Sequence, residues 1–290
     1  MGTKLTGIHI KNFRNIGRLD LDLTDPDGKP LNTVVLCGED GKTSVLEAII
    51  LALGLDNLLP TSRYDIKSMI QWGKKEAEIE VDLVDDNNMS SRKKYLRRDS
   101  SAISEPILYQ PPFVLYFGSD RDSKPGLEHS IEQEPFYLPH VEEVLTKVWY
   151  DFYEHGTSKG RFSLNYVNQA AGMIHFKLIL HKSNDMIIPV CELSSSEVDV
   201  LTILGTLVLC SPKPAIVLID EPELHKHIQL HRHLMYAIRK IVPESQIIVA
   251  TQSFTDIVSM VMSYERFCLL HEGDNRINTD KKGCIYKGGN

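Results

Sequence analysis

Residues 214–221 read Pro-Ala-Ile-Val-Leu-Ile-Asp-Glu. The apolar run is the pattern of a strand that is buried on both faces, as in the middle of a parallel sheet. Such a strand has no reason to end in two carboxylates, Asp220 and Glu221, unless its carboxyl end faces a cation. Ligands of open parallel sheets bind at this end of the strands, and a magnesium nucleotide would bring the cation. The alternative is that the two carboxylates cap a following helix.

A second segment, residues 33–53, combines a short apolar strand, a glycine loop and a helical apolar pattern. Strand, glycine loop, Lys-Thr and helix are typical of a phosphate-binding loop, where backbone N–H groups and the helix dipole hold the phosphates. We expect Lys42 to reach the β- and γ-phosphates and the Thr43 hydroxyl to ligate magnesium. The other predicted nucleotide contacts in this loop are Gly38, Gly41 and Ser44. The alternative is a plain strand-to-helix turn.

The loop is shorter than the usual motif. Gly38 and Gly41 enclose only Glu39 and Asp40, where the usual motif has four residues between its first glycine and the Gly-Lys pair. A loop two residues shorter cannot wrap the β-phosphate in the usual way. Two interpretations follow: the loop binds nucleotide poorly, or the natural gene encodes residues that this chain lacks.

Two further segments complete an ordered set. Residues 193–197 read Leu-Ser-Ser-Ser-Glu and precede a helical apolar run over 198–209. Residues 247–253 read Ile-Ile-Val-Ala-Thr-Gln-Ser, a strand that ends in small polar residues. With the phosphate loop and the acidic strand end, the order of these pieces resembles the ATPase head of the ABC type found in SMC-like and RecF-like proteins.

Other stretches extend the resemblance. Residues 8–15, Ile-His-Ile-Lys-Asn-Phe-Arg-Asn, are similar to the opening strand of those heads. Residues 220–227, Asp-Glu-Pro-Glu-Leu-His-Lys-His, resemble their Asp-Glu-Pro-Glu-Leu-His-Leu-His segment. The stretch 242–246 is similar to small single-chain ATPases of bacterial defence systems, such as the PtuA type. The resemblance covers residues 1–55 and 190–262 well and the middle of the chain loosely.

The resemblance implies roles for single residues. Asp220 would hold magnesium, directly or through water, and Glu221 would polarise the attacking water. Ser194 would contact the γ-phosphate of a nucleotide bound by a second head, which implies a homodimer with ATP sandwiched between its subunits. Arg14 would touch phosphate, and Gln252 stands where the family carries its switch histidine.

Three of the four motifs depart from the family pattern. Gln252 can donate a hydrogen bond to a phosphate oxygen but cannot carry the charge of a histidine. Ser196 stands where the family usually has glycine, and its side chain crowds the approach of backbone to phosphate. With the short loop, these departures predict an ATPase with degenerate motifs, either turning over slowly or binding ATP without turnover.

The predicted fold class is α/β: a P-loop NTPase head of the ABC type with a mixed central sheet, helices on both faces and an antiparallel β lobe. We expect one head over residues 1–290, with a nucleotide-binding core at 1–60 and 190–270 and an insertion of antiparallel strands and helix at 61–189. Strands are expected within the ranges 5–24, 76–84, 95–108, 113–117, 174–180, 186–190 and 267–270. Helices are expected at 138–153, 198–210, 228–241 and 254–263.

Composition places the chain among ordinary globular proteins, with 42% hydrophobic and 24% charged residues. Its net charge of −7 does not fit a protein that coats DNA by bulk attraction. The basic run 92–98 could contact a phosphate backbone, or it could be a solvated hairpin between two strands. Five widely spaced cysteines, no secretion signal and no long apolar stretch favour a reduced, cytoplasmic protein without membrane contact.

The sequence gives less support to a metal site and to a hydrolase or nuclease site. His227 and His231 are four residues apart, which puts two imidazoles on one helix face, but no carboxylate or cysteine supports a metal site there. No nucleophile elbow and no nuclease cluster is visible, so any effector chemistry must come from another chain.

Three functions remain open from the sequence. The first is a switch that binds ATP and Mg²⁺ and regulates a separate nuclease or toxin, in defence against phage by resemblance to the PtuA type. The second is a RecF-like ATPase that binds DNA in repair. The third is a scaffold that keeps the fold without hydrolysis, which the short loop, Ser196 and Gln252 favour.

Overall fold

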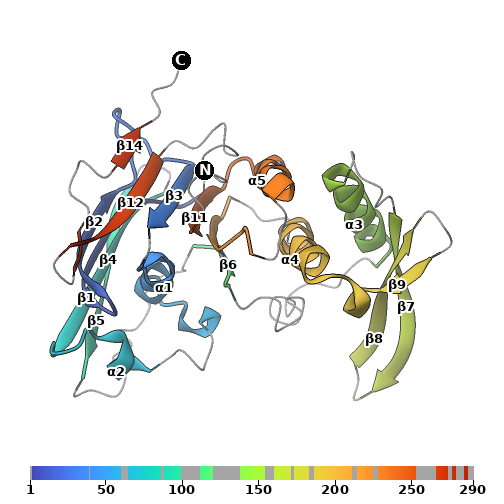
Figure 1. The fold of residues 1–290 in the computed structure, drawn as a ribbon, viewed down its shortest axis with the longest axis horizontal. Coiled ribbons are helices and arrows are strands. Elements are labelled where there is room, and N and C mark those ends of the chain that lie inside the picture. The colour runs from blue at the N-terminus through green and yellow to red at the C-terminus, as the bar shows by residue number, and fades with distance from the viewer. Residues whose placement is uncertain are drawn as a thin grey trace. The chain divides into compact units, whose positions relative to one another are not determined.

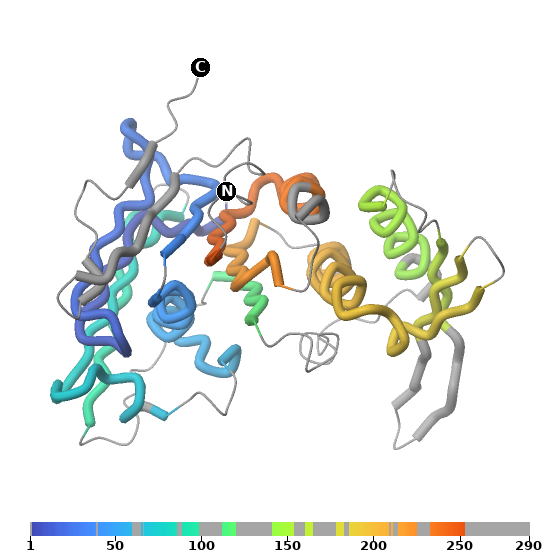
Figure 2. The backbone as a smooth tube through the Cα atoms, viewed as in Figure 1, coloured from blue at the N-terminus to red at the C-terminus, as the bar shows by residue number. Residues whose placement is uncertain are grey.

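The structure is a computed structural model, and the chain in it forms two compact units (Figures 1 and 2). The first unit comprises Met1–Gly118, Lys213–Pro222 and Glu244–Asn290, and the second comprises Ser119–Pro212 and Glu223–Pro243. The residues that the structure describes are 2–38, 40–59, 65–85, 88–98, 112–119, 138–153, 160–170, 173–182, 186–210, 214–224, 228–252, 266–273, 276–278 and 284–286.

A mixed sheet forms the centre of the first unit. Its strands are ordered β13-β12-β3-β11-β10-β6, with β14 also paired to β12. The pairs from β12 through β3, β11 and β10 to β6 are parallel, whereas β13 and β14 run antiparallel to β12. The bounds are β3 Thr33–Gly38, β6 Val114–Phe117, β10 Ile216–Asp220, β11 Gln246–Thr251, β12 Arg266–Gly273, β13 Arg276–Asn278 and β14 Cys284–Tyr286.

The middle strands of this sheet are apolar along their whole length because they are covered on both faces. Every residue of β10 and of β11 is buried, as the uninterrupted apolar pattern predicts. In the parallel register Asp220 lies opposite Ala250, and Thr251 lies opposite Cys37. The carboxyl ends of β3, β10 and β11 therefore meet at one edge of the sheet.

A second sheet of the first unit is antiparallel, with the order β2-β1-β4-β5. Burial alternates along β4, which confirms the strand expected at 76–84. Its partner is not 95–108 as expected, because Asp85 already pairs with Asn88 and Glu76 pairs with Arg97. The basic run 92–98 consequently lies mainly along β5 and is not a hairpin turn. The bounds are β1 Lys4–Phe13, β2 Ile16–Asp22, β4 Glu76–Asp85 and β5 Asn88–Arg97.

Helix α1 (Lys42–Ala52) packs against strands of both sheets (Figure 1). It contacts β1, β4 and β5 of the antiparallel sheet and β3, β10 and β11 of the central sheet. All of its residues except Thr43 are buried, which explains why the helix is apolar almost all round. The short helices of this unit are η1 (Asp56–Leu58) and α2 (Ile66–Met69).

The side chain of Gln246 joins three backbone segments in the core. Its Nε2 donates to the carbonyls of Leu5 (2.9 Å) and Leu31 (2.8 Å), and its Oε1 accepts from the N–H of Leu5 (2.7 Å). Gln246 is fully buried, so these bonds satisfy polar groups that have no access to water. One amide thus fixes the first strand of the antiparallel sheet to the start of β11.

Among its described residues, the second unit contains the helices α3, α4 and α5, the short 3-10 helix η4 and an antiparallel sheet with the order β7-β8-β9. Trp149 is 1% exposed and stacks edge-on against Phe162, with ring centroids 5.3 Å apart. The pairing of β8 with β9 confirms the expected hairpin, although β8 also pairs with β7. The bounds are α3 Leu138–Phe152, β7 Gly160–Ala170, β8 Met173–Lys182, β9 Ile187–Pro189, η4 Val190–Glu192, α4 Ser195–Leu209 and α5 Ile228–Ile241.

Most helices lie where the periodicity places them. Helix α5 has the expected bounds, and α4 begins at Ser195, three residues earlier than expected. The early start follows from a capping box between Ser194 and Glu197, which the apolar pattern alone does not reveal. The helix expected at 254–263 lies outside the described residues, and the expected division into core and insertion stays a prediction. Within the described part of the chain, no helix is both long and apolar enough to cross a membrane.

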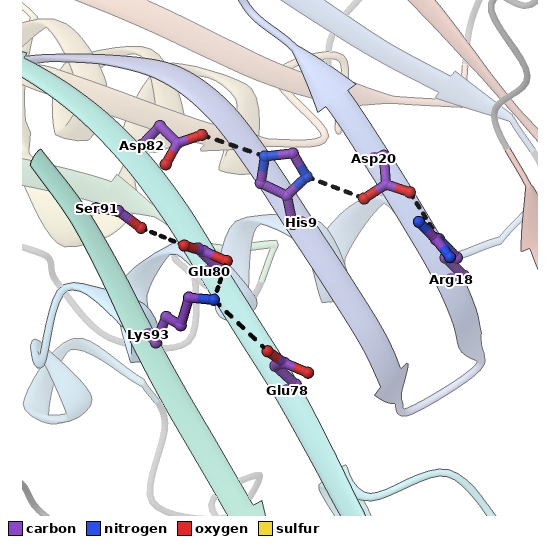
Figure 3. Close-up of polar contacts among 8 residues, drawn as sticks. All are labelled: His9, Arg18, Asp20, Glu78, Glu80, Asp82, Ser91 and Lys93. Atoms are coloured by element: carbon purple, nitrogen blue, oxygen red, sulfur yellow. Dashed lines mark hydrogen bonds and ion pairs between the residues drawn. The ribbon is translucent and has the colours of Figure 1, made fainter. Parts of the chain in front are cut away.

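The outward face of the antiparallel sheet carries a ladder of charged pairs (Figure 3). His9 lies between two carboxylates, with Nδ1 2.9 Å from Asp20 and Nε2 3.2 Å from Asp82. Partial burial disfavours the charged imidazole, but hydrogen bonds and attraction to Asp20 and Asp82 raise the pKa of His9 above its ordinary value. On the neighbouring strands, Lys93 Nζ lies 2.7 Å from Glu80.

Replacing Gln246 by leucine should lower the free energy of unfolding by about 3 kcal/mol or more, because three buried backbone groups lose their partners at roughly 1–3 kcal/mol each. Urea denaturation measures the change. The exposed neighbour Glu244→Ala serves as the control and should leave the midpoint nearly unchanged. Equal midpoints for both variants would contradict the role of the amide.

Protonated His9 should stabilise the fold, and its contribution should disappear as the pH rises. Because the folded-state pKa is raised, the stabilisation is complete below the unfolded value of about 6.5 and is lost through the higher folded value. The side chain is 42% exposed, so we expect less than about 1 kcal/mol. The difference in unfolding free energy between wild type and His9→Gln should be larger at about pH 6 than at about pH 8.5. A pH-independent difference would argue against this contribution.

Candidate functional site

The segment between β3 and α1 turns through two glycines with positive φ. Gly38 ends β3 with φ 140° and Gly41 is the N-cap of α1 with φ 85°, a conformation that side chains disfavour. Gly41 has no side chain to cap the helix, and a helix N-terminus of this kind favours a bound anion through its N–H groups and its dipole. Gly38, Gly41 and the start of α1 belong to the part of the expected phosphate loop that the structure describes.

Lys42 is the first residue of α1 and is almost completely buried, at 4% exposure. Its ammonium donates a hydrogen bond to the carbonyl of Gly38, four residues earlier. A buried lysine carries its charge at a cost unless partners surround it. The ammonium is thus held at the loop where the sequence places the phosphates.

The contact between Thr43 and Asp220 brings the phosphate loop to the acidic strand end. The Thr43 hydroxyl lies 2.9 and 3.1 Å from the two carboxylate oxygens of Asp220, which is fully buried at the end of β10. The two residues are 177 positions apart in the chain. Three hard oxygen atoms therefore converge at the sheet edge, and this donor set suits Mg²⁺, which takes one or two protein ligands together with phosphates and water.

Glu221 follows β10 in a strained backbone conformation. Its φ is 48°, a region rarely populated by residues with a side chain, and its N–H donates to the carbonyl of Ala250 (2.8 Å). The amide of Gln252, just past the end of β11, donates to the Glu221 carboxylate. The parallel register of β10 and β11 thus places these two predicted site residues in direct contact.

Arg14 sits in the tight turn between β1 and β2 and points its guanidinium at helix α1. Its Nη2 lies 2.7 Å from Oε2 of Glu47, a carboxylate with 0% exposure. The backbone φ of Arg14 is 50°, and its N–H bonds to the carbonyl of Met69 at 2.6 Å. Next to it, the Ser44 hydroxyl lies 3.3 Å from the Asn15 side chain. A buried ion pair therefore fixes Arg14 beside the phosphate loop.

A pocket of about 690 Å³ opens beside this loop, within the usual size range of small-molecule sites. One side is formed by Arg14, Asn15 and the start of α1, and the other by α2, the turn after it and the end of β5. Its lining residues are Arg14, Asn15, Asp40, Gly41, Ser44, Asp65, Lys67, Ser68, Ile70, Trp72 and Arg98.

Ser194 lies in the second unit, at the N-terminus of α4. Its hydroxyl lies 2.9 Å from Oε2 of Glu197, and the N–H of Glu197 returns a bond to Ser194 Oγ (3.3 Å). Lys182 Nζ lies 3.3 Å from Oε1 of the same carboxylate. Burial alone would raise the pKa of Glu197, but the bonds from Ser194 and the charge of Lys182 lower it below its ordinary value. The exposed serine is thus held in one rotamer.

The structure brings most of the predicted site residues together at one edge of the central sheet. Lys42, Thr43, Asp220, Glu221 and Gln252 all follow or end β3, β10 and β11. Ser194 belongs to the other unit, so its expected place across a second nucleotide stays a prediction. The pair His227 and His231, weighed as a metal site, lies outside the residues whose side chains are described.

Sequence reasoning missed Glu47, Asn15, Trp72 and Arg98. Glu47 offered a signal, because it is a single carboxylate in the apolar run Val-Leu-Glu-Ala-Ile of a buried helix. Trp72 and Arg98 belong to separate segments that only the folded chain brings to one pocket.

Solved structures with this fold cover nearly the whole chain. An SMC head bound to the C-winged helix domain of ScpA is 14% identical, covers 98% of each chain and has a TM-score of 0.71. The SMC head domain from Thermotoga maritima is 11% identical over 99% of this chain and 100% of its own, with a TM-score of 0.62. The recombination mediator RecF is 11% identical over 96% of this chain and 98% of its own, also with 0.62. These likenesses confirm the predicted fold class.

By sequence, no curated protein matches this chain. One protein family does match, and it is described as "AAA domain, putative AbiEii toxin, Type IV TA system". The match spans residues 73–258, more than half of the chain. It contains Ser194, Asp220, Glu221 and Gln252 but begins after the phosphate loop. The chain therefore belongs to this family of AAA domains.

Proposed function

We propose that this protein is an ATP- and Mg²⁺-binding head that hydrolyses ATP, dimerises around the nucleotide and thereby regulates a separate effector. The observation that carries the proposal is the contact of Thr43 with Asp220, which sets the phosphate loop against the acidic end of β10. This is the juxtaposition that a magnesium triphosphate requires, because Thr43 and Asp220 would hold the metal beside the phosphate loop, where it would offset the charge of the phosphates.

Different residues at the sheet edge bind the phosphates and the metal. Lys42 and the N–H groups at the start of α1 bind the phosphates, and Arg14 lies on the wall of the adjoining pocket. Thr43 and Asp220 hold the metal, which when bound offsets the charge of the phosphates. The pocket of about 690 Å³ gives the rest of the nucleotide a place beside Gly41 and Ser44.

Glu221 is the group that we assign to the attacking water. A carboxylate there accepts a proton from the water as its oxygen approaches the γ-phosphate. Gln252 donates a hydrogen bond to this carboxylate, so it orients Glu221 and cannot itself take the proton. Gln252 cannot carry the charge of the switch histidine found in similar heads, so it offsets less of the negative charge at the γ-phosphate, and we expect slow hydrolysis.

In the proposed dimer, Ser194 contacts the nucleotide of the other subunit. Its position at the exposed N-terminus of α4 suits contact with the γ-phosphate of a nucleotide held by a second copy. ATP then joins two subunits, and loss of the γ-phosphate releases them. The family description names a toxin system, which supports an effector such as a toxin or nuclease as the regulated partner, and a role in defence against phage like that of the PtuA type.

The DNA-repair alternative has less support from the charged surface. The basic side chains of β5 are largely paired with acidic neighbours: Lys93 with Glu80 (2.7 Å) and Lys94 with Asp56 (3.4 Å). Arg97 lies 3.6 Å from Glu76. Lysines and arginines in such pairs contribute little net positive potential to a DNA backbone. We therefore favour the protein effector over a DNA partner.

Replacing Lys42 by alanine should weaken Mg²⁺·ATP binding roughly 10- to 100-fold, because a charge-assisted contact worth about 1.5–3 kcal/mol is lost. Titration calorimetry measures the affinity. Lys29→Ala, an exposed lysine in the turn before β3, is the control and should bind like wild type. If wild type fails to bind millimolar ATP with magnesium, the protein is a scaffold and the proposal fails.

Replacing Glu221 by glutamine should reduce ATP hydrolysis about 100- to 10,000-fold and preserve binding, because the water loses its base. The ATP-bound dimer should then accumulate, as read by light scattering with and without nucleotide. The double variant Glu221→Gln with Ser194→Arg should stay monomeric with ATP. An ATP-independent oligomeric state in both variants would refute the sandwich dimer.

A further inference from the structure

Trp72 is the most exposed large apolar side chain in the part of the chain that the structure describes. Its exposure is 93%, whereas Trp149, the other tryptophan of the chain, is 1% exposed. An indole presents about 150–250 Å² of mostly apolar surface that is normally removed from water. Single exposed apolar residues are common, so exposure alone does not indicate a binding role. Two further features of Trp72 do: the turn that carries it and the pocket that it lines.

The backbone beneath Trp72 is fixed. Residues 71–74 form a turn in which the N–H of Lys74 donates to the carbonyl of Gln71 (3.0 Å) and Gly73 has φ 78°, as a type II turn requires. Arg98, just past the end of β5, donates to the carbonyls of Lys74 (2.7 Å), Ile70 (2.9 Å) and Gln71 (3.2 Å). The backbone that carries the indole is therefore held in place by several hydrogen bonds.

This turn is also tied to the strand that leads to Arg14. The N–H of Gln71 donates to the carbonyl of Asn12 (2.9 Å), and the N–H of Arg14 donates to that of Met69 (2.6 Å). The backbone of Trp72 thus has a set position relative to the turn that carries Arg14. A fixed backbone lowers the conformational entropy that is lost when a partner stacks on the side chain.

Trp72 belongs to the wall of the pocket that begins at the phosphate loop. The same pocket is lined by Gly41 and Ser44 at the start of α1 and by Arg14. Because this pocket adjoins Gly41 and Ser44, it is where we place the sugar and base of a triphosphate bound at that loop. The exposed π-face is then the one large aromatic surface that the described lining residues offer to a base.

We propose that Trp72 stacks on the base of the bound nucleotide and sets the base preference of the site. The proposal rests on the nucleotide function proposed above and adds to it the group that recognises the base. Stacking is available to every base, but the larger face of a purine gains more from it, so purine nucleotides should bind more tightly than pyrimidine nucleotides. Arg98 is a positioning residue, since it holds the turn and not the base.

The experiment compares ATP with inorganic tripolyphosphate, each with Mg²⁺, because the second ligand has the phosphates without the base. Trp72→Ala should weaken ATP binding about 5- to 150-fold, the range for loss of one base stack, and leave tripolyphosphate affinity unchanged. Trp72→Phe should restore most of the ATP affinity. Unchanged thermal unfolding of the alanine variant is expected from the 93% exposure and shows that the fold is intact.

Intrinsic fluorescence gives an independent readout because the chain has only two tryptophans. ATP should quench the emission of wild type, tripolyphosphate should not, and Trp72→Phe, which retains only Trp149, should lose the quenching while it still binds ATP. CTP should bind more weakly than ATP to wild type, and this difference should shrink in Trp72→Ala.

The outcomes separate this proposal from the function on which it rests. If Trp72→Ala binds ATP like wild type, or loses ATP and tripolyphosphate affinity equally, the stacking role is overturned while nucleotide binding stands. If wild type binds neither ligand, or Lys42→Ala changes neither affinity, the nucleotide function itself fails.

Discussion

The hydrogen bonds between the Thr43 hydroxyl and the Asp220 carboxylate are the interaction on which the proposed nucleotide site depends. They join the first turn of α1 to the end of β10 across a parallel sheet whose middle strands are buried on both faces. A buried carboxylate is costly without partners, so the hydroxyl stabilises Asp220 here, and a bound metal would add to this stabilisation. The strain at Glu221 lies directly beside it, at φ 48°.

The cost of burying polar groups also explains the ion pair and the hydrogen bonds around the site. Helix α1 is packed between two sheets, so its one buried carboxylate, Glu47, needs a cation, and Arg14 of the β1–β2 turn supplies it at 2.7 Å. Gln246 ties β1 to the central sheet by two bonds to Leu5 and makes a third bond to the carbonyl of Leu31. The strands that carry Arg14 and Asp220 are thus held by polar contacts that admit little adjustment, which is how a site of fixed geometry is kept in an otherwise apolar core.

Several strands predicted from the sequence are confirmed, because each prediction depends only on the pattern of apolar residues within one segment. Uninterrupted apolar runs predicted β10 and β11, and strict alternation predicted β4. The partner of β4 was misplaced because the basic side chains of 92–98 obscured the alternation of β5, whose charges pair with those of β4. The capping box at Ser194 was also overlooked, although Ser-x-x-Glu was visible.

The sequence by itself determined which residues end the buried strands. Apolar runs predict the buried strands, and the glycine or acidic residues that follow each run predict where the strand ends. It could not determine which distant side chains come together. The contact between Arg14 and Glu47, and the presence of Trp72, Arg98 and Gly41 around one pocket, depend on how strands far apart in the chain pair. The tertiary structure decided these contacts because the register of each sheet and the position of α1 between the two sheets fix the directions in which the side chains point.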